Sequence, residues 1–387
     1  MEAVRSPMCL PTAGGLSAMS PMDLVRQIVD ALLQRAGVHA SDIDRLLVEC
    51  DTETGGQPYV AGQPRQPGDP VQVHIPAITI GQRCGTGQQI LHLAAQEVAQ
   101  GRYGSVVVAG AGSMYGSSPT GDHSETSATP APFDKSAGVH PRVLAAELLA
   151  AKWGIRREHL DAYTVRSHQR ASEVAAAGEF EPEIVPITVA SDGLLRQVLH
   201  DEAIDIDLTT ARLRTLGPTV LDPVVARQHP EISCSITVGN SARRVAGASA
   251  LLLMNEHHAA RLGVRPRAYF CGFSVARPDP ALPLAAPLQA TKQILADRQM
   301  SVGQLDHVEV DEEFACVPLA WTAEFPVSPD LFNPRGGALA LGIPRACGGL
   351  RQITTMLNAL EATGGRFGLQ TMSADAGGAY ACLIECR

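Results

Sequence analysis

The chain has 387 residues and a formal net charge of −9, and only 4% of its residues are aromatic. A chain of this length can bury a sizeable core in two or three packed units. Its acidic balance argues against nucleic acid as the main partner, because phosphate contacts need concentrated lysine and arginine. Nine scattered cysteines suggest neither a disulfide framework nor a metal site. With no apolar run of 18 residues and no signal peptide at the start, we expect a soluble, cytoplasmic protein with no membrane partner.

The first predicted elements surround a cysteine. A predicted strand over 43–50 precedes a glycine-rich linker, and an extended β-branched stretch then leads to Cys84. From about residue 87 to residue 100, apolar residues recur on one face of a predicted amphipathic helix. A thiol at such a strand-to-helix turn lies at the positive end of the helix dipole, which favours the thiolate. The flanking Gly85 and Gly87 would let a thioester approach closely, whereas spacing alone also allows a buried apolar cysteine.

Strand, glycine-rich turn, helix and strand occur twice along the chain, which suggests a duplicated α/β unit. The first copy ends in a predicted strand over 105–109. The second copy consists of a strand over 308–310, a turn over 336–344, a helix over 349–362 and a strand over 379–385.

A helix-rich insertion separates the two copies. Residues 116–140 are rich in Ser, Thr, Pro and Gly and are predicted to form a loop. Two helices are predicted next, over 142–153 and 157–177, with Gly178 ending the second. The layout of residues 187–235 stays open.

Ordered motifs run along nearly the whole chain. They lie at 2–7, 84–87, 108–114, 167–186, 333–342 and 364–372. Together they resemble the thiolase family, and the last motif is similar to that of steroid side-chain and lipid-degrading thiolases. The resemblance implies an α/β fold with a five-layered α-β-α-β-α core made of two similar halves and an inserted loop domain. It predicts an N-terminal half over 1–115 plus 246–266, a loop domain over 116–245 and a C-terminal half over 267–387.

The resemblance also implies a chemistry. In such enzymes a cysteine attacks an acyl thioester and holds the acyl group, which a second acyl-CoA or coenzyme A then removes. A histidine activates the cysteine, an asparagine supports the oxyanion hole through water, and a second cysteine moves the α-proton. Coenzyme A thioester would therefore be a substrate, with no permanently bound cofactor and no metal.

The chain departs from this pattern at the chemical groups. The family's Gly-His-Pro reads Gly342-Ile343-Pro344, and isoleucine cannot take a proton or donate a hydrogen bond. Asp311 replaces the asparagine, and its charge would oppose an oxyanion unless the carboxyl is protonated. Ser373 replaces the second cysteine, so a hydroxyl stands where the family has a thiol.

Cys84, Asp311 and Ser373 are the predicted catalytic residues. Asp311 would be the general base, while the backbone N–H groups of Cys84 and Asp375 would form the oxyanion hole. The predicted contacts to coenzyme A are Arg243, Asn240 and Gly342, and Ala242-Arg243 replaces the family's Ser-Gly. Four histidines outside the motifs are interpreted as surface or structural groups: His140, His200, His257 and His307.

Three functions remain open. The favoured one is a diverged acyltransferase that takes an acyl group from coenzyme A or a carrier protein onto Cys84. The second is a non-catalytic subunit that pairs with another thiolase-like chain, and the third is a conventional thiolase whose base comes from elsewhere. Retention of the nucleophile favours the first, because a pure scaffold gains nothing from an electropositive thiol. The 116–140 loop is shorter than the tetramer-forming loop of degradative thiolases, so the resemblance favours a homodimer over a tetramer.

Overall fold

The computed structural model describes residues 1–50, 75–81, 86–112, 141–191, 194–219, 223–277, 279–374 and 378–387. Four residues named above, Cys84, Gly85, His140 and Asp375, and the predicted loop over 116–140 lie outside these ranges.

The N-terminal half is built on a five-stranded sheet with the strand order β1-β8-β4-β2-β3. Its strands are β1 (Glu2–Arg5), β2 (Arg45–Cys50), β3 (Ala77–Gly81), β4 (Ser105–Gly112) and β8 (Gly247–Met254). The strands β2, β3 and β4 are parallel to one another, and β8 runs antiparallel to β1 and β4. Side chains alternate between the two faces, so Val107 packs with helix α1 (Pro21–Ala36) and Val108 packs with helix α2 (Thr86–Ala99).

The C-terminal half repeats this plan on a four-stranded sheet with the order β10-β12-β13-β9. The strands are β9 (Ala268–Ala276), β10 (His307–Val310), β12 (Phe367–Ser373) and β13 (Ala379–Cys386). One face packs on α8 (Ala286–Asp297) and α9 (Cys316–Glu324), and the other packs on α11 (Gly348–Thr363).

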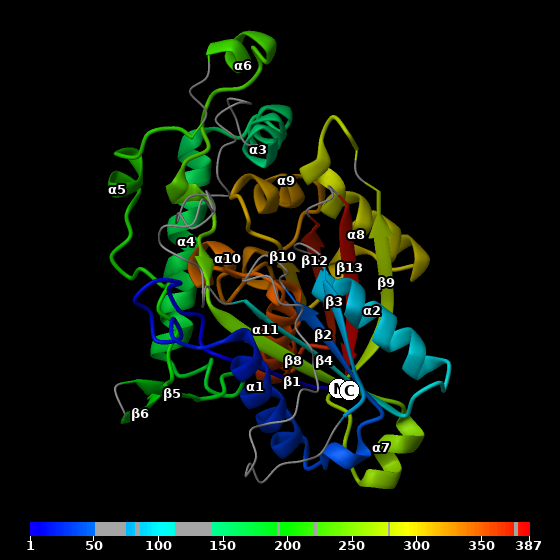
Figure 1. Cartoon of the computed structure of the whole chain (residues 1–387). Coiled ribbons are helices and arrows are strands. Elements are labelled where there is room, and N and C mark those ends of the chain that lie inside the picture. Colours follow the sequence, from blue (N-terminus) through cyan, green and yellow to red (C-terminus); the bar gives the residue numbers. More distant parts are fainter. Residues whose placement is uncertain are drawn as a thin grey trace.

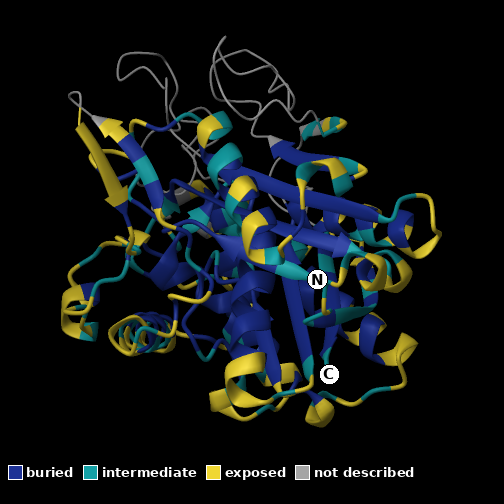
Figure 2. Cartoon of the chain, turned by 90° about the horizontal axis from the view of Figure 1, so that it is seen from below, coloured by how far each residue is buried: buried dark blue, intermediate teal, exposed yellow. Residues whose placement is uncertain are grey.

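Helices α2 and α11 lie between the two sheets and share one apolar core with both. That core joins Ile90 of α2 and Ile353 of α11 to Leu251 of the first sheet and Ile384 of the second. The layers are therefore α1, first sheet, α2 with α11, second sheet and α8, which confirms the predicted five-layered core (Figure 1). Figure 2 shows the buried strands and central helices enclosed by helices whose outer faces are exposed.

The helices predicted between the halves are present as α3 (Pro141–Lys152) and α4 (Arg157–Ala176). The insertion continues with β5 (Ile187–Ser191), β6 (Leu194–Val198), α5 (Thr210–Arg214) and α6 (Pro223–Gln228), along one side of the core in Figure 1. A buried arginine joins this region to the first sheet: Nε of Arg5 donates to Glu183 at 2.5 Å and its Nη1 donates to Asp201 at 2.8 Å. The domain boundaries predicted from the resemblance stay a prediction.

Candidate active site at the ends of β10 and β12

Two of the predicted catalytic residues lie side by side at the carboxyl end of the second sheet. Asp311 follows β10 directly, and Ser373 is the last residue of β12. The two strands are parallel and pair Val310 with Thr371, so their carboxyl ends meet at one edge. The backbone N–H of Asp311 donates to the Thr371 carbonyl at 3.0 Å, and the backbone N–H of Ser373 donates to Oδ2 of Asp311 at 3.4 Å.

The environment of Asp311 favours its neutral form. The residue is 4% exposed, and burial together with the negative charge of Glu313 raises the pKa of Asp311 to about 7. The positive charge of Arg142 and the N–H donors of Ser373 and Glu313 act in the opposite direction. A carboxyl group with this pKa exists in both protonation states near neutrality, which is the condition for acid–base catalysis.

Ser373 offers a buried hydroxyl. The residue is 3% exposed, and its Oγ has no hydrogen-bond partner among the described residues. A buried hydroxyl without a partner carries a desolvation cost of roughly 1–3 kcal/mol, which a bound polar group can remove.

A salt bridge that the sequence analysis missed borders this pair. Arg142, in the first turn of α3, holds Glu313 with two guanidinium nitrogens, and its Nε lies 2.7 Å from Oε1. Its Nη1 also donates to the carbonyl of Ala374 at 3.4 Å. Arg142 begins a predicted helix and Glu313 lies two residues after Asp311, but nothing in the sequence links positions 171 residues apart.

Glu312 lies between Asp311 and Glu313 in the sequence, and its side chain anchors the end of β10 through a separate set of contacts. Its carboxylate accepts hydrogen bonds from Tyr163 at 2.7 Å, Ser167 at 2.8 Å and Asn333 at 2.8 Å. The backbone N–H of Leu339 is a fourth donor, at 3.1 Å. These contacts tie the backbone next to Asp311 to α4 and to α10 (Ala338–Leu341), so the site is built on rigid elements.

The segment from residue 240 to residue 245 runs alongside this strand end and carries two of the three predicted coenzyme A contacts, Asn240 and Arg243. The Ala242 N–H donates to the Glu313 carbonyl at 2.9 Å, and the Ile343 N–H donates to the Arg243 carbonyl at 2.8 Å. Strand β7 (Arg244–Val245) pairs in parallel with β11 (Ile343–Pro344). The structure therefore brings the segments of Asp311, Arg243 and Gly342 into one backbone network.

The side chains on this segment differ in their availability. The Asn240 amide is used inside the fold, because it donates to Ser235 and Asp161 and accepts from the Thr237 N–H. Arg243, in contrast, is exposed. Burial, followed by the charge of Arg243, lowers the pKa of His168 to about 4, so this imidazole is neutral at physiological pH.

Gly342 is required by its backbone geometry. Its φ angle is +81°, and a Cβ atom built on it would lie 2.3 Å from Cγ1 of Val245. Only glycine fits this turn without displacing β7.

The predicted nucleophile lies outside the described residues, but its flanks are described. Strand β3 ends at Gly81 and helix α2 begins at Thr86, so the strand and the helix predicted on either side of Cys84 are both present. Of the four histidines, His200 and His257 are exposed, while buried His307 lies 2.8 Å from Glu309 through Nε2.

Two further observations concern the described residues alone. They contain no group of three or more His, Cys, Asp or Glu side chains placed to hold a metal ion. Among their helices, none combines the length and the apolar character that a membrane span needs.

Two known protein-family domains together match nearly the whole chain. The thiolase N-terminal domain family matches residues 1–257, and the thiolase C-terminal domain family matches residues 264–386. The chain is 30% identical to a steroid 3-ketoacyl-CoA thiolase of Mycobacterium tuberculosis, over 100% of this chain and 93% of that protein. It is 33% identical to a 3-ketoacyl-CoA thiolase of Escherichia coli, over 100% of this chain and 98% of that protein.

Solved structures agree on the fold. The chain superposes on human mitochondrial 3-ketoacyl-CoA thiolase with a TM-score of 0.84 at 24% identity, and on the acetyl-CoA acetyltransferase of Bacillus anthracis with 0.82 at 25% identity. Each match covers 100% of this chain and 98% of the other. With both family domains in order and the layered core intact, this chain belongs to the thiolase family.

Proposed function

We propose that this protein is an acyltransferase that carries its acyl group as a thioester on Cys84. The observation that carries the proposal is Asp311, a buried carboxyl with a pKa of about 7, beside the Ser373 hydroxyl, which has no hydrogen-bond partner among the described residues. Family membership supports it, because the relatives named above are thiolases that act on 3-ketoacyl-CoA. The strand and helix on either side of Cys84 support it as well.

In the first step, the Cys84 thiolate attacks the carbonyl carbon of an acyl thioester. The new carbon–sulfur bond forms as the carbonyl electrons move to oxygen, and collapse of the tetrahedral intermediate expels the donor thiolate. In the second step, the Asp311 carboxylate takes the proton of an acceptor nucleophile, which attacks the acyl-enzyme and releases Cys84 as thiolate. The Ser373 hydroxyl is placed to donate a hydrogen bond to the substrate at this edge.

Ordinary thiolysis is not the reaction we propose. Ile343 stands where the family's pattern has a histidine, and Ser373 stands where it has a second cysteine. Loss of one oxyanion donor typically costs about 3–4 kcal/mol of transition-state stabilisation, and loss of a general base costs about 10²–10⁴ in rate. The acceptor we propose therefore needs no α-proton abstraction.

The acyl donor we propose is an acyl-CoA or an acyl-carrier protein. The exposed guanidinium of Arg243 is suited to the donor's phosphates, while Asn240 and Gly342 shape the segment that presents it. We propose that the protein acts in the cytoplasm as a homodimer with no permanently bound cofactor.

Intact mass spectrometry tests the acyl-enzyme directly. The protein is mixed with a stoichiometric amount of acetyl-CoA or octanoyl-CoA, and acylation adds the mass of one acyl group. That mass should be absent from Cys84→Ala and present in the matched variant Cys234→Ala, which removes a half-buried cysteine elsewhere. An unmodified wild-type protein with every donor, a carrier-protein thioester included, contradicts the proposal.

A second function is favoured by one observation, the isoleucine at position 343. In this alternative the chain is a catalytically inactive subunit of a heteromer with an active thiolase-like protein. Co-expression with such a homologue, followed by size-exclusion chromatography, tests it. A co-eluting mixed species would favour the alternative, and homodimers under all conditions would count against it.

A further inference from the structure

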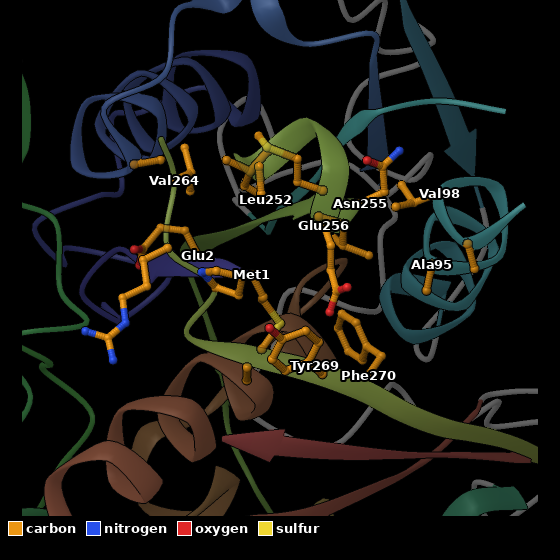
Figure 3. A pocket seen from close by; sticks show the side chains of 18 of the residues that line it. Met1, Glu2, Ala95, Val98, Leu252, Asn255, Glu256, Val264, Tyr269 and Phe270 are labelled. Carbon is orange, nitrogen blue, oxygen red and sulfur yellow. The ribbon is translucent and has the colours of Figure 1, made fainter. Parts of the chain in front are cut away.

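An apolar cavity of about 490 Å³ lies where the two halves of the chain meet. Its walls come from the start of the chain, the ends of α1, α2 and β8, α7 (Glu256–Leu262), the linker over 263–266 and the start of β9. We call it the junction cavity; Figure 3 shows its lining side chains. Its volume falls in the range of roughly 300–1,000 Å³ that small-molecule sites occupy.

The junction cavity is remote from the candidate active site. The register of β13 pairs Cys386 with Ala268 at one end of the second sheet and Ala379 with Ala276 at the other. Ser373 pairs with Ala379, whereas the cavity is lined by Ala268 and its neighbours. The two sites therefore lie at opposite ends of the same strands.

Most residues that line the junction cavity are apolar, and the polar side chains of Glu2, Arg35, Asn255 and Glu256 line it as well. Val98, Leu252 and Val264 line it from three different elements, and the ring of Phe270 closes one side (Figure 3). Glu256 extends its carboxylate toward Tyr269 and Phe270 on that side in Figure 3. An aliphatic group fits these walls, and Glu256 disfavours a second negative charge beside the rings.

A second cavity of about 710 Å³ adjoins the first, because Arg265 and Pro266 line both. Four guanidinium groups line this second, arginine cavity: Arg265, Arg267, Arg366 and Arg387. A gathering of four cations is notable in a chain whose net charge is −9.

Three of the four cations are neutralised within the fold. Arg267 binds Glu2 and Glu361, and Arg366 and Arg387 share Glu385. Arg265 is exposed, and it forms no salt bridge with any described residue. Arg265 therefore places a positive charge at the boundary between the two cavities, and Arg35, whose guanidinium donates to the carbonyls of Pro182 and Ile184, lines the junction cavity as a second cation.

From this arrangement we propose that the two cavities form one binding site for an amphiphilic anion. Its aliphatic chain would occupy the junction cavity, and its carboxylate or phosphate head would bind Arg265 at the entrance to the arginine cavity. This proposal does not rest on the acyl transfer proposed above, because the two sites share no residue.

Isothermal titration calorimetry with the full chain tests the site. The ligands are dodecanoate and dodecyl phosphate below their micelle-forming concentrations, with dodecyltrimethylammonium and inorganic phosphate as comparisons. We expect one equivalent of either anionic amphiphile to bind, and neither comparison compound to bind measurably. Tighter binding of dodecyl phosphate would identify a phosphate-bearing lipid as the source, and tighter binding of dodecanoate would identify a fatty acid.

Two variants locate the binding. Arg265→Glu should weaken it by about tenfold or more, because it replaces the attraction by repulsion, while the matched exposed variant Arg214→Glu should not. Ala95→Phe should abolish binding by filling the cavity, whereas Ala176→Phe, on the exposed side of α4, should leave it intact. If Ala95→Phe does not fold, Ala99→Phe, at an exposed lining position, repeats the test.

Acylation of Cys84 serves as the control, because it should be unchanged in all of these variants. Binding that survives both Arg265→Glu and the cavity-filling variant would place the amphiphile elsewhere and overturn the proposal. Equal affinity for dodecyltrimethylammonium would overturn it as well, because the head-group site would then show no preference for an anion.

Discussion

The guanidinium of Arg142 and the carboxylate of Glu313 form a two-pronged ion pair beside Asp311, with Nε and Oε1 2.7 Å apart. The two charges act in opposite directions on the neighbouring carboxyl group: Glu313 raises the pKa of Asp311 and Arg142 lowers it. Burial is the largest influence on the pKa of the proposed general base, and a pair that brings together the insertion and the C-terminal half adjusts it further.

Neutralising either partner should move the titration of Asp311. Arg142→Met removes a cation and should raise the pKa of Asp311, and Glu313→Gln removes an anion and should lower it. Carboxyl carbon NMR of aspartate-labelled protein measures the titration directly. Because Asp311 must be ionised to act as a base, the acidic limb of the pH profile for transfer from the acyl-enzyme should shift in the same directions.

Lys292→Met provides the control for that experiment, because it breaks a surface pair with Glu324, 3.2 Å away, and should leave the titration unchanged. Identical profiles for Arg142→Met and Glu313→Gln would show that this pair does not set the state of Asp311.

The stability of the protein should depend on pH through Asp311. Its pKa rises from an ordinary 3.8 to about 7 in the folded protein, so between these values the folded state binds more protons than the unfolded state. The contribution of Asp311 to the free energy of unfolding is therefore fully present below about pH 4 and is lost as the pH rises through 7. Since one pKa unit corresponds to 1.36 kcal/mol, the loss is at most about 4 kcal/mol.

Asp311→Asn removes this titration and should gain stability relative to the wild type between about pH 5 and about pH 8. Chemical denaturation at the two pH values gives the difference. If the difference in unfolding free energy between the wild type and Asp311→Asn is the same at both pH values, Asp311 has the same pKa in the folded and unfolded states.

Glu312→Ala should be strongly destabilising. The substitution leaves three buried side-chain donors, on Tyr163, Ser167 and Asn333, without their shared acceptor. We expect a loss of about 3–5 kcal/mol in the free energy of unfolding. Glu324→Ala, on the surface, should change stability by less than about 0.5 kcal/mol. A similar effect for both substitutions would argue against Glu312 as the anchor of the strand end.

Comparison of Gly37→Ala with Gly342→Ala separates the cost of backbone strain from the cost of steric overlap. At Gly37 the φ angle is +66° and an added Cβ meets nothing within 4 Å, so Gly37→Ala should cost only about 1–2 kcal/mol. At Gly342 the new Cβ also overlaps Val245, which should add about 1–3 kcal/mol. Thermal unfolding of the two variants compares them, and equal losses would show that β7 moves aside freely.

Much of the fold follows from local patterns in the sequence. The helix predicted over 349–362 is α11, Gly348–Thr363, and the strand predicted over 379–385 is β13, Ala379–Cys386. Apolar periodicity predicts these elements because each presents one face, or both, to the core. The five layers followed from the resemblance of whole motifs to the thiolase family.

The sequence by itself determined the elements, the family and the residue types at the reacting end of the second sheet: Asp311, Ser373 and the glycine turn at 342. Only the tertiary structure decided how these groups behave. Burial and the charge of Glu313 raise the pKa of Asp311 to about 7, and Arg142, 169 positions away along the chain, opposes them. The cavity between the halves likewise exists only once the two sheets are packed together. Burial and electrostatic interactions between distant residues depend on which surfaces pack against each other, and a local sequence pattern does not predict that packing.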